Sequence, residues 1–519
     1  MNECLEVVGN NGKFQKIIIY ICVLDSLLTT IYTLIISFLT KEPDFFIIDK
    51  ENSNENPVHA SYSKEICDDT KYKITKDTKS IHNWTYEFNL FCDREYLNTY
   101  VIYSILIGQL LGTLLLSPIP DKYGRKKIFI IIITVSLIIH INLILVVNPF
   151  HVIISNLTGG ITSFAYTMGF YIIIEYIKKD LTGLVLGFFN AIYPLFGVFL
   201  GFFFLTINNF RILFVITTIL SIILSYLTFF YFTESPHWLH SMGRKQECLD
   251  VLTFIAKVND KEKEWSDFQI KNPEIINKIG EKKIEKQNKK SYNIIQILGF
   301  PSQRKKIILL CCLWFASGMN FFGILLNLGH MEGNFFLNGI LSFSGEIISE
   351  LGSGYLADIK GRIWVMKYSA YLGSISFLIY KFVGINLKSI FVMGGMFGYA
   401  AVYNVLGIYV PENFPVFIRA NVTGFLIVLL RFSPMLVPYL TDRLGQNVDY
   451  IFICLGFFAG FILNFLDETF GKPIIEHIPE EEDEDLKNKF INDMESRGIT
   501  INEVIFTSPH SSMNSYKVK

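Results

Sequence analysis

The apolar residues of this chain fall in long blocks separated by short polar breaks. The first block runs from Ile17 to Leu39 and is interrupted only by Asp25 and a few hydroxyl side chains. A helix of about 20 apolar residues spans the ~30 Å hydrocarbon core of a bilayer. No small-residue cleavage site follows this block, so we interpret it as a first membrane span and not as a signal peptide. Similar blocks recur almost to the end of the chain, which predicts a polytopic α-helical membrane protein.

Twelve such spans are predicted, six in each half of the chain. The spans of the first half lie near residues 16–39, 99–119, 128–147, 150–177, 181–206 and 212–232. Those of the second half lie near residues 307–329, 335–357, 363–382, 388–410, 422–442 and 447–466. The predicted regions are a cytosolic N-terminus (1–15), a first six-helix half (16–232) with an extracellular loop (41–98), a cytosolic linker (233–306), a second six-helix half (307–466) and a cytosolic tail (467–519).

Composition supports a lipid environment. Hydrophobic residues make up 51% of the 519 positions and charged residues only 18%, with a mean hydropathy of +0.38. These values lie outside the usual range for soluble domains. The net charge of −1 gives no reason to expect a nucleic-acid partner. The expected partners are the lipid bilayer and a small solute.

Positive charge is distributed unequally between the loops, which predicts the orientation. Lys and Arg gather after spans two, four, eight and ten, for example at Lys122 and at Lys360. The opposing loops at 148–151 and 329–334 contain no Lys or Arg. Because short cytosolic loops carry the excess of positive charge, both termini are predicted to face the cytosol and the loop 41–98 to lie outside.

The long outer loop contains features typical of an oxidising compartment. Asn83, Trp84 and Thr85 form a glycosylation sequon, and Cys67 and Cys92 are the two cysteines of eight that share this polar segment. We therefore predict a glycan on Asn83, a Cys67–Cys92 disulfide and a location in the plasma membrane.

A D-x-x-G-R pattern occurs after span two and again after span eight. Its members are Asp121, Gly124 and Arg125 in the first half and Asp358, Gly361 and Arg362 in the second half. Duplicated halves with a binding site at their interface are typical of secondary transporters. Charges at these helix ends could pair across helices and separate when the halves rock, which is a gating role. The alternative is that they only anchor the chain to the inner membrane surface.

These motifs resemble the major facilitator superfamily, and more narrowly its organic cation, organic anion and carnitine transporter branch. The segments that carry the narrower resemblance are Gly12–Gln15, Glu87–Asp93, Glu234–Leu239 with Gly243 and Arg244, Glu412–Arg419 and Asp467–Pro473. The resemblance covers about residues 9 to 478. It implies an all-α membrane fold with twelve transmembrane helices in two pseudo-repeated six-helix halves. The further residues that we assign to gating are Glu175, Glu234, Arg244, Glu412, Arg419 and Glu468.

Sugar porters are the nearest rival, because they share the D-x-x-G-R loops and the E-S-P-x-W-L element. They usually lack the long cysteine-bearing outer loop, and this chain has no Gln-Gln pair in span seven. The chain also departs from the favoured branch. Ser117 replaces the glycine that opens the first motif, and Thr233 and His237 replace a proline and an arginine around Ser235.

Four ionisable residues stand out within the predicted spans, namely Asp25, Glu346, Glu350 and Arg431. Such a residue costs roughly 2.5–3.5 kcal/mol near the bilayer centre, so it requires a partner or a function. Glu346 and Glu350 are one helical turn apart and share a face. An internal Glu–Arg pair is one interpretation, and a solute cavity lined by these residues is the other. Asp25 is equally well explained as a solute contact, a proton-coupling site or a partly hydrated acid.

The resemblance sharpens the substrate prediction. Glu346 stands where the resembling transporters carry an acid. Arg431 stands where cation carriers tend to have Asp and anion or carnitine carriers Arg, and Glu350 where anion carriers tend to have Lys. This mixture favours a carnitine-like zwitterion or an organic cation over a dianion.

Aromatic side chains in the spans could hold a quaternary ammonium through cation–π contacts. The candidates are Trp314, Phe321 and Phe322 in span seven, with Tyr193 and Asn190 in span five. Packing is the competing explanation for each aromatic residue, because the chain contains 47 Phe.

The function predicted from the sequence is secondary or facilitative transport of a small organic ion by alternating access. No G-x-x-x-x-G-K-[ST] loop is present, which argues against ATP-driven pumping, so we expect the energy to come from solute gradients, the membrane potential or protons. The alternatives are a sugar-type or organic-anion carrier and a non-transporting sensor. We predict no enzyme activity, no cofactor and no metal site, because the spans contain no H-E-x-x-H and no metal-like His/Cys cluster.

Overall fold

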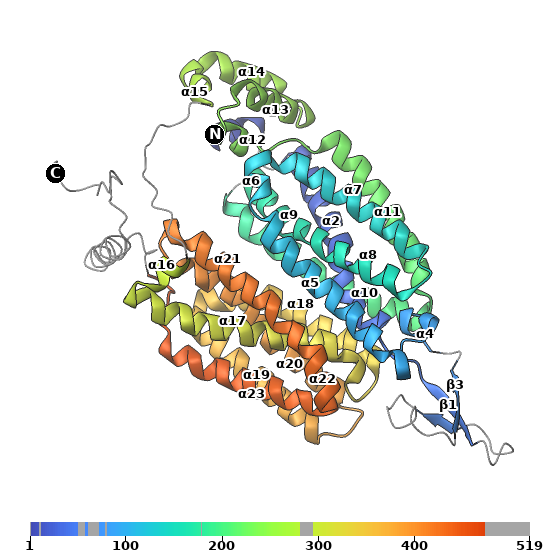
Figure 1. Ribbon diagram of the computed structural model, residues 1–519. Helices are drawn as coiled ribbons and strands as arrows, with labels where there is room; N and C mark the ends of the chain where they lie inside the picture. Colours follow the sequence, from blue (N-terminus) through green and yellow to red (C-terminus); the bar gives the residue numbers. More distant parts are fainter. Residues whose placement is uncertain are drawn as a thin grey trace, which may run out of the picture.

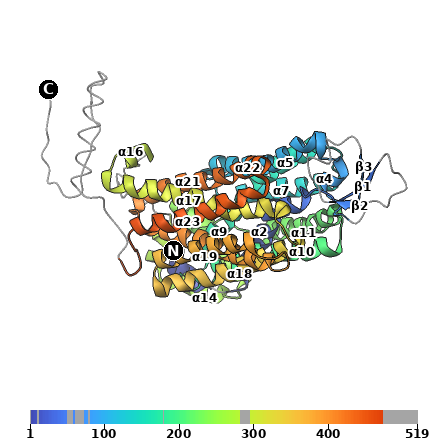
Figure 2. The ribbon, with the colours of Figure 1, turned by 90° about the horizontal axis from the view of Figure 1, so that it is seen from below.

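Two helical bundles lie side by side in the computed structural model (Figure 1). It describes residues 2–9, 12–49, 58–60, 72–77, 80–177, 179–280 and 294–472. Short helices of the linker lie at one end of the first bundle, and a small β-sheet lies at the opposite end, as Figures 1 and 2 show. We call these the linker end, marked by α12 to α15, and the loop end, marked by α4 and the sheet.

Each of the twelve predicted spans corresponds to one helix or to two consecutive helices. The first half contains α2 (Lys13–Leu39), α5 (Glu95–Leu116), α7 (Arg125–Ile144), α8 (Pro149–Thr162) with α9 (Phe164–Tyr176), α10 (Lys179–Thr206) and α11 (Phe210–Tyr231). The second half contains α17 (Pro301–Asn327), α18 (Phe335–Lys360), α19 (Arg362–Phe382), α20 (Lys388–Glu412), α21 (Val416–Phe432) with α22 (Leu436–Leu444), and α23 (Val448–Ile462). Short 3-10 segments, η2 to η5, lie next to these helices at Leu328–His330, Ser433–Met435, Gly445–Asn447 and Leu463–Phe465.

Nine segments of the described residues are long and apolar enough to cross a membrane. Asn421–Phe465, which covers the last two predicted spans, counts as one of these nine segments. The helices α18 and α19 are not among the nine. These two helices are less apolar, because α18 carries Glu346 and Glu350 and α19 carries Lys367 and Lys381. Large apolar side chains are exposed on the outside of the bundles, as a lipid-facing surface requires.

Short elements occupy the connections. The linker forms α12 (Pro236–Ser241), α13 (Lys245–Val258), α14 (Glu262–Lys271), α15 (Pro273–Lys278) and α16 (Ile294–Leu298), and α6 (Ile119–Tyr123) precedes α7. The N-terminal helix α1 (Asn2–Val8) packs against α13 and α14. The outer loop contains α4 (Trp84–Phe88), η1 (Cys92–Arg94) and strands β1 (Phe45–Asp49), β2 (Val58–Ala60) and β3 (Tyr72–Lys76). The sheet is antiparallel in the order β2-β1-β3, with Phe45 opposite Ala60 and Lys76, and it was not predicted.

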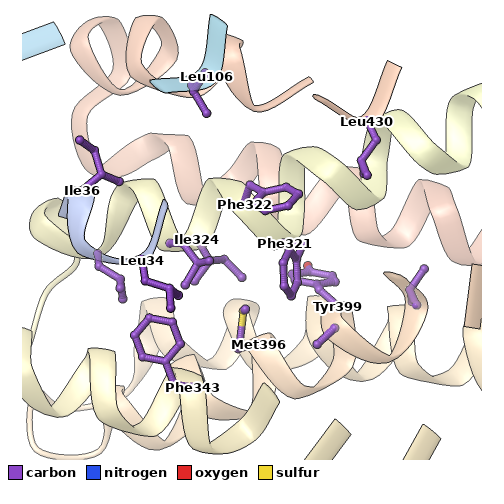
Figure 3. Close-up of a cluster of buried hydrophobic side chains, with 14 of the residues drawn as sticks. Leu34, Ile36, Leu106, Phe321, Phe322, Ile324, Phe343, Met396, Tyr399 and Leu430 are labelled. Atoms are coloured by element: carbon purple, nitrogen blue, oxygen red, sulfur yellow. The ribbon is translucent and has the colours of Figure 1, made fainter. Parts of the chain in front are cut away.

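The two halves pack against each other through α10 and α18, α5 and α21, and α2 and α17. One hydrophobic cluster continues across this interface: Leu34 of α2 and Leu106 of α5 belong to the same cluster as Phe321 of α17 and Phe343 of α18 (Figure 3). The hydroxyl of Ser37 also donates to the backbone oxygen of Leu325. The halves are therefore in direct contact toward the loop end.

Candidate functional site

The first D-x-x-G-R motif forms a charge cluster at the linker end. Arg125 Nη2 lies 3.0 Å from Asp121 Oδ1 and 3.0 Å from Glu175 Oε1 of α9. The backbone N–H groups of Arg125 and Lys126, at the first turn of α7, donate to the carboxylate of Glu234 at 2.8 and 3.3 Å. Burial raises the pKa of Glu234, and these backbone donors oppose that shift. The cluster joins α6, α7, α9 and the start of the linker.

The second motif builds the same cluster in the other half. Arg362 Nη1 lies 2.9 Å from Asp358 Oδ1, and Arg362 Nη2 lies 3.1 Å from Glu412 Oε1 of α20. The backbone N–H groups of Arg362 and Ile363 donate to Glu468 at 2.8 and 2.9 Å. The arginine and the glutamate of the interhelical ion pair are 50 residues apart in both halves. The repeat seen in the sequence is thus also a repeat of contacts.

A glycine with positive φ turns the chain in each cluster. Gly124 has φ +100° and Gly361 has φ +98°, a backbone region that L side chains rarely adopt. A Cβ atom at Gly124 would lie 2.3 Å from Glu234 Oε2, and one at Gly361 would lie 2.5 Å from Glu468 Oε2. Only glycine lets the carboxylate approach the helix start this closely.

Two further arginines assigned to gating, Arg244 and Arg419, lie outside these clusters, and their gating role stays a prediction. Arg244 forms an ion pair with Glu247, one turn away, and its guanidinium lies 5.6 Å from the centre of the Trp238 ring. The Arg419 side chain donates to the backbone oxygen of Phe414 at 3.2 and 3.3 Å. Both side chains act locally, because their carboxylate or carbonyl partner lies in the neighbouring sequence.

Glu346, which is buried, and Arg431, which is partly buried, lie between the halves, and the described residues show no ion pair between them. Glu346 on α18 is 1% exposed, and its Oε2 atom has no hydrogen-bond partner among the described residues. Arg431 on α21 donates to Gln109 Oε1 of α5 at 3.4 Å, and its guanidinium lies 5.5 Å from the centre of the Phe322 ring. The internal Glu–Arg pair, one of the two interpretations of the sequence, is therefore not formed by Glu346 and Arg431 among the described residues. Gln109 was not predicted.

Two tyrosines of the first half face the charges of the second half. Tyr166 on α9 and Tyr193 on α10 each interact electrostatically with both Glu346 and Arg431. The Tyr166 hydroxyl donates to Asn190 Oδ1 at 2.9 Å, whereas the buried Tyr193 hydroxyl has no hydrogen-bond partner among the described residues. An acid, a guanidinium and two phenols from four helices therefore surround one region at the interface.

Of the other predicted acids, Glu350 joins this region and Asp25 does not. Glu350 interacts electrostatically with Glu346 and with Tyr166. Asp25 lies buried in α2, and neither carboxyl oxygen has a hydrogen-bond partner among the described residues. No described contact links Asp25 to Glu346 or Arg431, so the assignment of Asp25 to the same site gains no support.

An aromatic cluster borders the same region. Tyr403 on α20 stacks on Phe321 with ring centres 4.8 Å apart, and Phe322 and Trp314 lie 6.1 and 6.3 Å from it. Tyr403 also interacts electrostatically with Glu346. The sequence analysis identified the three residues of α17 but missed Tyr403 and Tyr166. Their position as hydroxyl-bearing aromatics inside apolar spans was the available signal.

The side chain of Asn83, the predicted glycosylation site, is buried in the structure. Asn83 is the N-cap of α4, where its side chain accepts the Tyr86 N–H at 2.9 Å. Its Nδ2 atom donates to the backbone oxygens of Phe38 and Lys41 at 2.8 and 2.9 Å, and the residue is 1% exposed. A glycan would have to be attached to this buried nitrogen. Asn83 therefore caps α4 and holds the outer loop onto α2, and a glycan at this residue stays a prediction.

The structure describes only one of the two cysteines of the predicted disulfide. Cys92 in η1 takes part in a disulfide, and Cys67 lies outside the described residues. The Cys67–Cys92 pairing stays a prediction.

Known proteins resemble this chain in sequence and in fold. The family model of the Major Facilitator Superfamily matches residues 96–438. The organic cation transporter protein of Drosophila melanogaster is 24% identical, over 93% of this chain and 94% of that protein. The human organic cation/carnitine transporter 2 is 25% identical, over 75% and 70%, and the beta-alanine transporter of D. melanogaster is 22% identical, over 93% and 89%. The inward open xylose transporter XylE from E. coli superposes with a TM-score of 0.60 at 15% identity, over 88% and 97%.

Proposed function

This chain belongs to the major facilitator superfamily, and on that premise we propose that it carries a small organic cation or a carnitine-like zwitterion across the plasma membrane. The match confirms the family and the fold class predicted from the motifs, and the named relatives support the organic cation and carnitine branch. The chain is a multi-pass membrane transporter that works by alternating access.

The arrangement of Glu346 and Arg431 carries the substrate proposal. Glu346 is buried at the interface of the halves, Arg431 is partly buried there, and neither neutralises the other among the described residues. Because unpaired buried charges are costly, a bound solute that supplies the missing partners is stabilised there. An ammonium group beside Glu346 would also face the rings of Tyr403 and Phe321, and a carboxylate would face Arg431. A zwitterion satisfies both charges at once.

The named relatives agree with this chemistry. They include carriers of organic cations, of carnitine and of β-alanine. Carnitine and β-alanine each combine a cationic nitrogen with a carboxylate. The xylose transporter is only 15% identical in sequence to this chain. Its similarity therefore supports the fold and does not support a sugar substrate.

We further infer that this structure is the state in which the solute site opens toward the linker end. The halves touch toward the loop end, where Phe38 lies 5.1 Å from Phe335, ring centre to ring centre. The clusters around Arg125 and Arg362 share no ion pair with each other among the described residues. In the opposite state these clusters would approach and close the linker end. The excess of Lys and Arg in the linker-end loops supports a cytosolic position for this end and for both termini.

Uptake into vesicles that contain the purified protein tests the proposal. The probes are a labelled quaternary cation, a carnitine-like zwitterion and a dicarboxylate. We expect uptake of the zwitterion or the cation, and at least a tenfold loss of cation uptake in Glu346→Gln, about 1.4 kcal/mol of lost binding. Arg431→Gln should weaken the zwitterion more than the cation. Ile348→Leu, on the exposed face of the same helix, is the control and should transport normally.

Four outcomes would overturn parts of this proposal. Uptake of the dicarboxylate alone would show that Arg431 dominates and that the chain is an organic-anion carrier. Equal cation uptake by Glu346→Gln and Ile348→Leu would remove Glu346 from the site. Binding of a probe without flux would favour a sensor, and an absence of both would favour a sugar-type substrate.

A further inference from the structure

A cavity of about 180 Å³ lies at the loop end, away from the Glu346 region. Lys41, Glu42 and Asp44 line it from the segment after α2, Leu205 from the end of α10, and Phe336 from the start of α18. Drug-sized ligand pockets occupy roughly 300–1,000 Å³, so this cavity suits a ligand of few heavy atoms.

The cavity presents two carboxylates, those of Glu42 and Asp44, that have no partner among the described residues. No ion pair or hydrogen bond to the Glu42 or Asp44 carboxylate is formed by the described residues. The Asp44 backbone is nevertheless held in place: its N–H donates to Ser80 Oγ at 3.0 Å, and its oxygen accepts the Asp77 N–H at 2.8 Å. The free acids are therefore presented by an anchored segment.

The neighbouring lysine does not neutralise these acids. Lys41 Nζ lies 5.2 Å from the centre of the Phe335 ring and donates to the backbone oxygen of Glu42 at 3.5 Å. The three charged side chains of the cavity sum to −1, and the Phe336 ring supplies an aromatic lining. Carboxylates beside an aromatic ring favour an ammonium ligand over an anion or a neutral sugar.

The cavity also lies across the junction of the halves. Leu205 belongs to the first half and Phe336 to the second half, so both walls are present together only while the loop end is closed. The adjacent closure is aromatic: Phe38 lies between Phe204 and Phe335, with ring centres 5.2 and 5.1 Å away. A ligand that contacts both walls would bind this state more tightly than a state with separated halves.

We propose that this cavity binds a small organic cation, and that the bound cation holds the transporter in its loop-end-closed state. A cation outside the cell then slows transport without competing for the Glu346 region. The effect on transport rests on the proposed function and on its orientation, whereas the binding itself does not.

The binding test uses full-length protein with Glu346→Gln, which disables the other cation site. Tetramethylammonium is titrated while the melting temperature is measured, because a ligand of the folded state raises it with concentration. We expect saturable stabilisation that needs at least tenfold more tetramethylammonium after Glu42→Gln and Asp44→Asn are added. Asp93→Asn, an exposed loop-end acid outside the cavity, should leave the titration unchanged. Phe336→Leu should also weaken binding, because it removes the ring.

These titrations can fail in two ways, and each overturns the proposal. An equal response of the cavity variant and Asp93→Asn would exclude the cavity, and loss of all binding in Glu346→Gln alone would place the cation in the central site. The ligand-free melting temperature shows whether each variant is folded, and the milder Glu42→Gln alone replaces the double variant if that one is unfolded.

Transport supplies the second readout in otherwise unmodified protein. External tetramethylammonium should lower the maximal uptake rate of the transported probe, and the cavity variant should lose this effect while any rise in KM from competition at the Glu346 region remains. Inhibition that only raises KM would contradict the proposal. If no probe is transported, the proposed function fails while the binding titration still decides whether the cavity holds a cation.

Discussion

At the scale of single residues, the two motif glycines show how a carboxylate is used as a helix cap. In both halves the chain turns through a positive φ, and the next backbone N–H groups point at a glutamate that comes from more than 100 residues away in the sequence. A negative charge at a helix N-terminus satisfies donors that have no partner within the helix. Gly124 and Gly361 therefore serve the gating clusters without touching the solute.

Replacing Gly361 with alanine should damage the second cluster. The new Cβ would require a strained backbone, which costs about 1–3 kcal/mol, and would lie 2.5 Å from Glu468 Oε2. We expect a lower melting temperature and at least a tenfold slower uptake. Gly354→Ala in α18 is the matched control, because a Cβ there meets nothing within 4 Å. If Gly361→Ala melts and transports like Gly354→Ala, the capping argument is wrong.

At the scale of elements, one side chain joins the N-terminus to the linker. Asn259, directly after α13, donates from Nδ2 to the backbone oxygens of Val8 and Gly9 at 2.8 and 3.2 Å, and its Oδ1 accepts the Phe14 N–H at 2.9 Å. A Cβ at Gly12 would lie 2.2 Å from Asn259 Oδ1. The Gly12–Gln15 motif thus has a structural explanation, because α1 and the start of α2 close around this amide.

Asn259→Ala should release α1 from the linker helices. Three backbone contacts are lost and buried polar groups are left unpaired, at about 1–3 kcal/mol per unsatisfied group. We expect a lower melting temperature and faster proteolysis within residues 2–12, read by mass spectrometry. Asn277→Ala, which removes a single exposed contact to Lys245, is the control. Equal cleavage of the two variants would show that hydrophobic packing alone holds α1.

The sequence predicted where the helices lie along the chain better than it predicted which face of each helix turns toward the interior. Long apolar blocks locate spans, because length and hydropathy suffice for that. The spans are apolar on most of their faces, so periodicity does not reveal which face turns inward. Buried charges such as Glu346 and Arg431 were found because charge is rare in lipid, whereas Tyr403 and Tyr166 differ little in character from lipid-facing tyrosines.

The same limit explains which contacts were not predicted at the loop end and the linker end. A sequon identifies a residue type but not its burial, so the capping contacts of the Asn83 side chain were not predicted. Arg244 and Arg419 lie in motifs of the family, but a motif does not say whether the partner is local or on another helix. The lysine–acid pairs Lys388–Glu332 and Lys381–Asp449 escaped notice because they lie at the ends of spans, where charge is ordinary.

At the scale of the whole molecule, the loop end is closed by close packing of α10 on α18. A Cβ at Gly197 would lie 2.5 Å from the ring of Phe343, and one at Gly201 would lie 2.5 Å from Ile340. Small residues let two helices approach, so these glycines set the separation of the halves. Alternating access requires this contact to open, and its tightness biases the equilibrium between the two states.

A large side chain at Gly197 should therefore shift the molecule toward the state that is open at the loop end. Gly197→Leu places a branched side chain against Phe343, whereas Gly187→Leu on the same helix meets nothing within 4 Å and is the control. Spin labels at Tyr96→Cys and Phe382→Cys, both exposed and on different halves, report the separation. Serine replaces Cys311, Cys312 and Cys454 to prevent labelling elsewhere. We expect a longer distance population in Gly197→Leu only. An unchanged distance in a folded variant would mean that α10 and α18 move as one body, and that the halves separate along another surface.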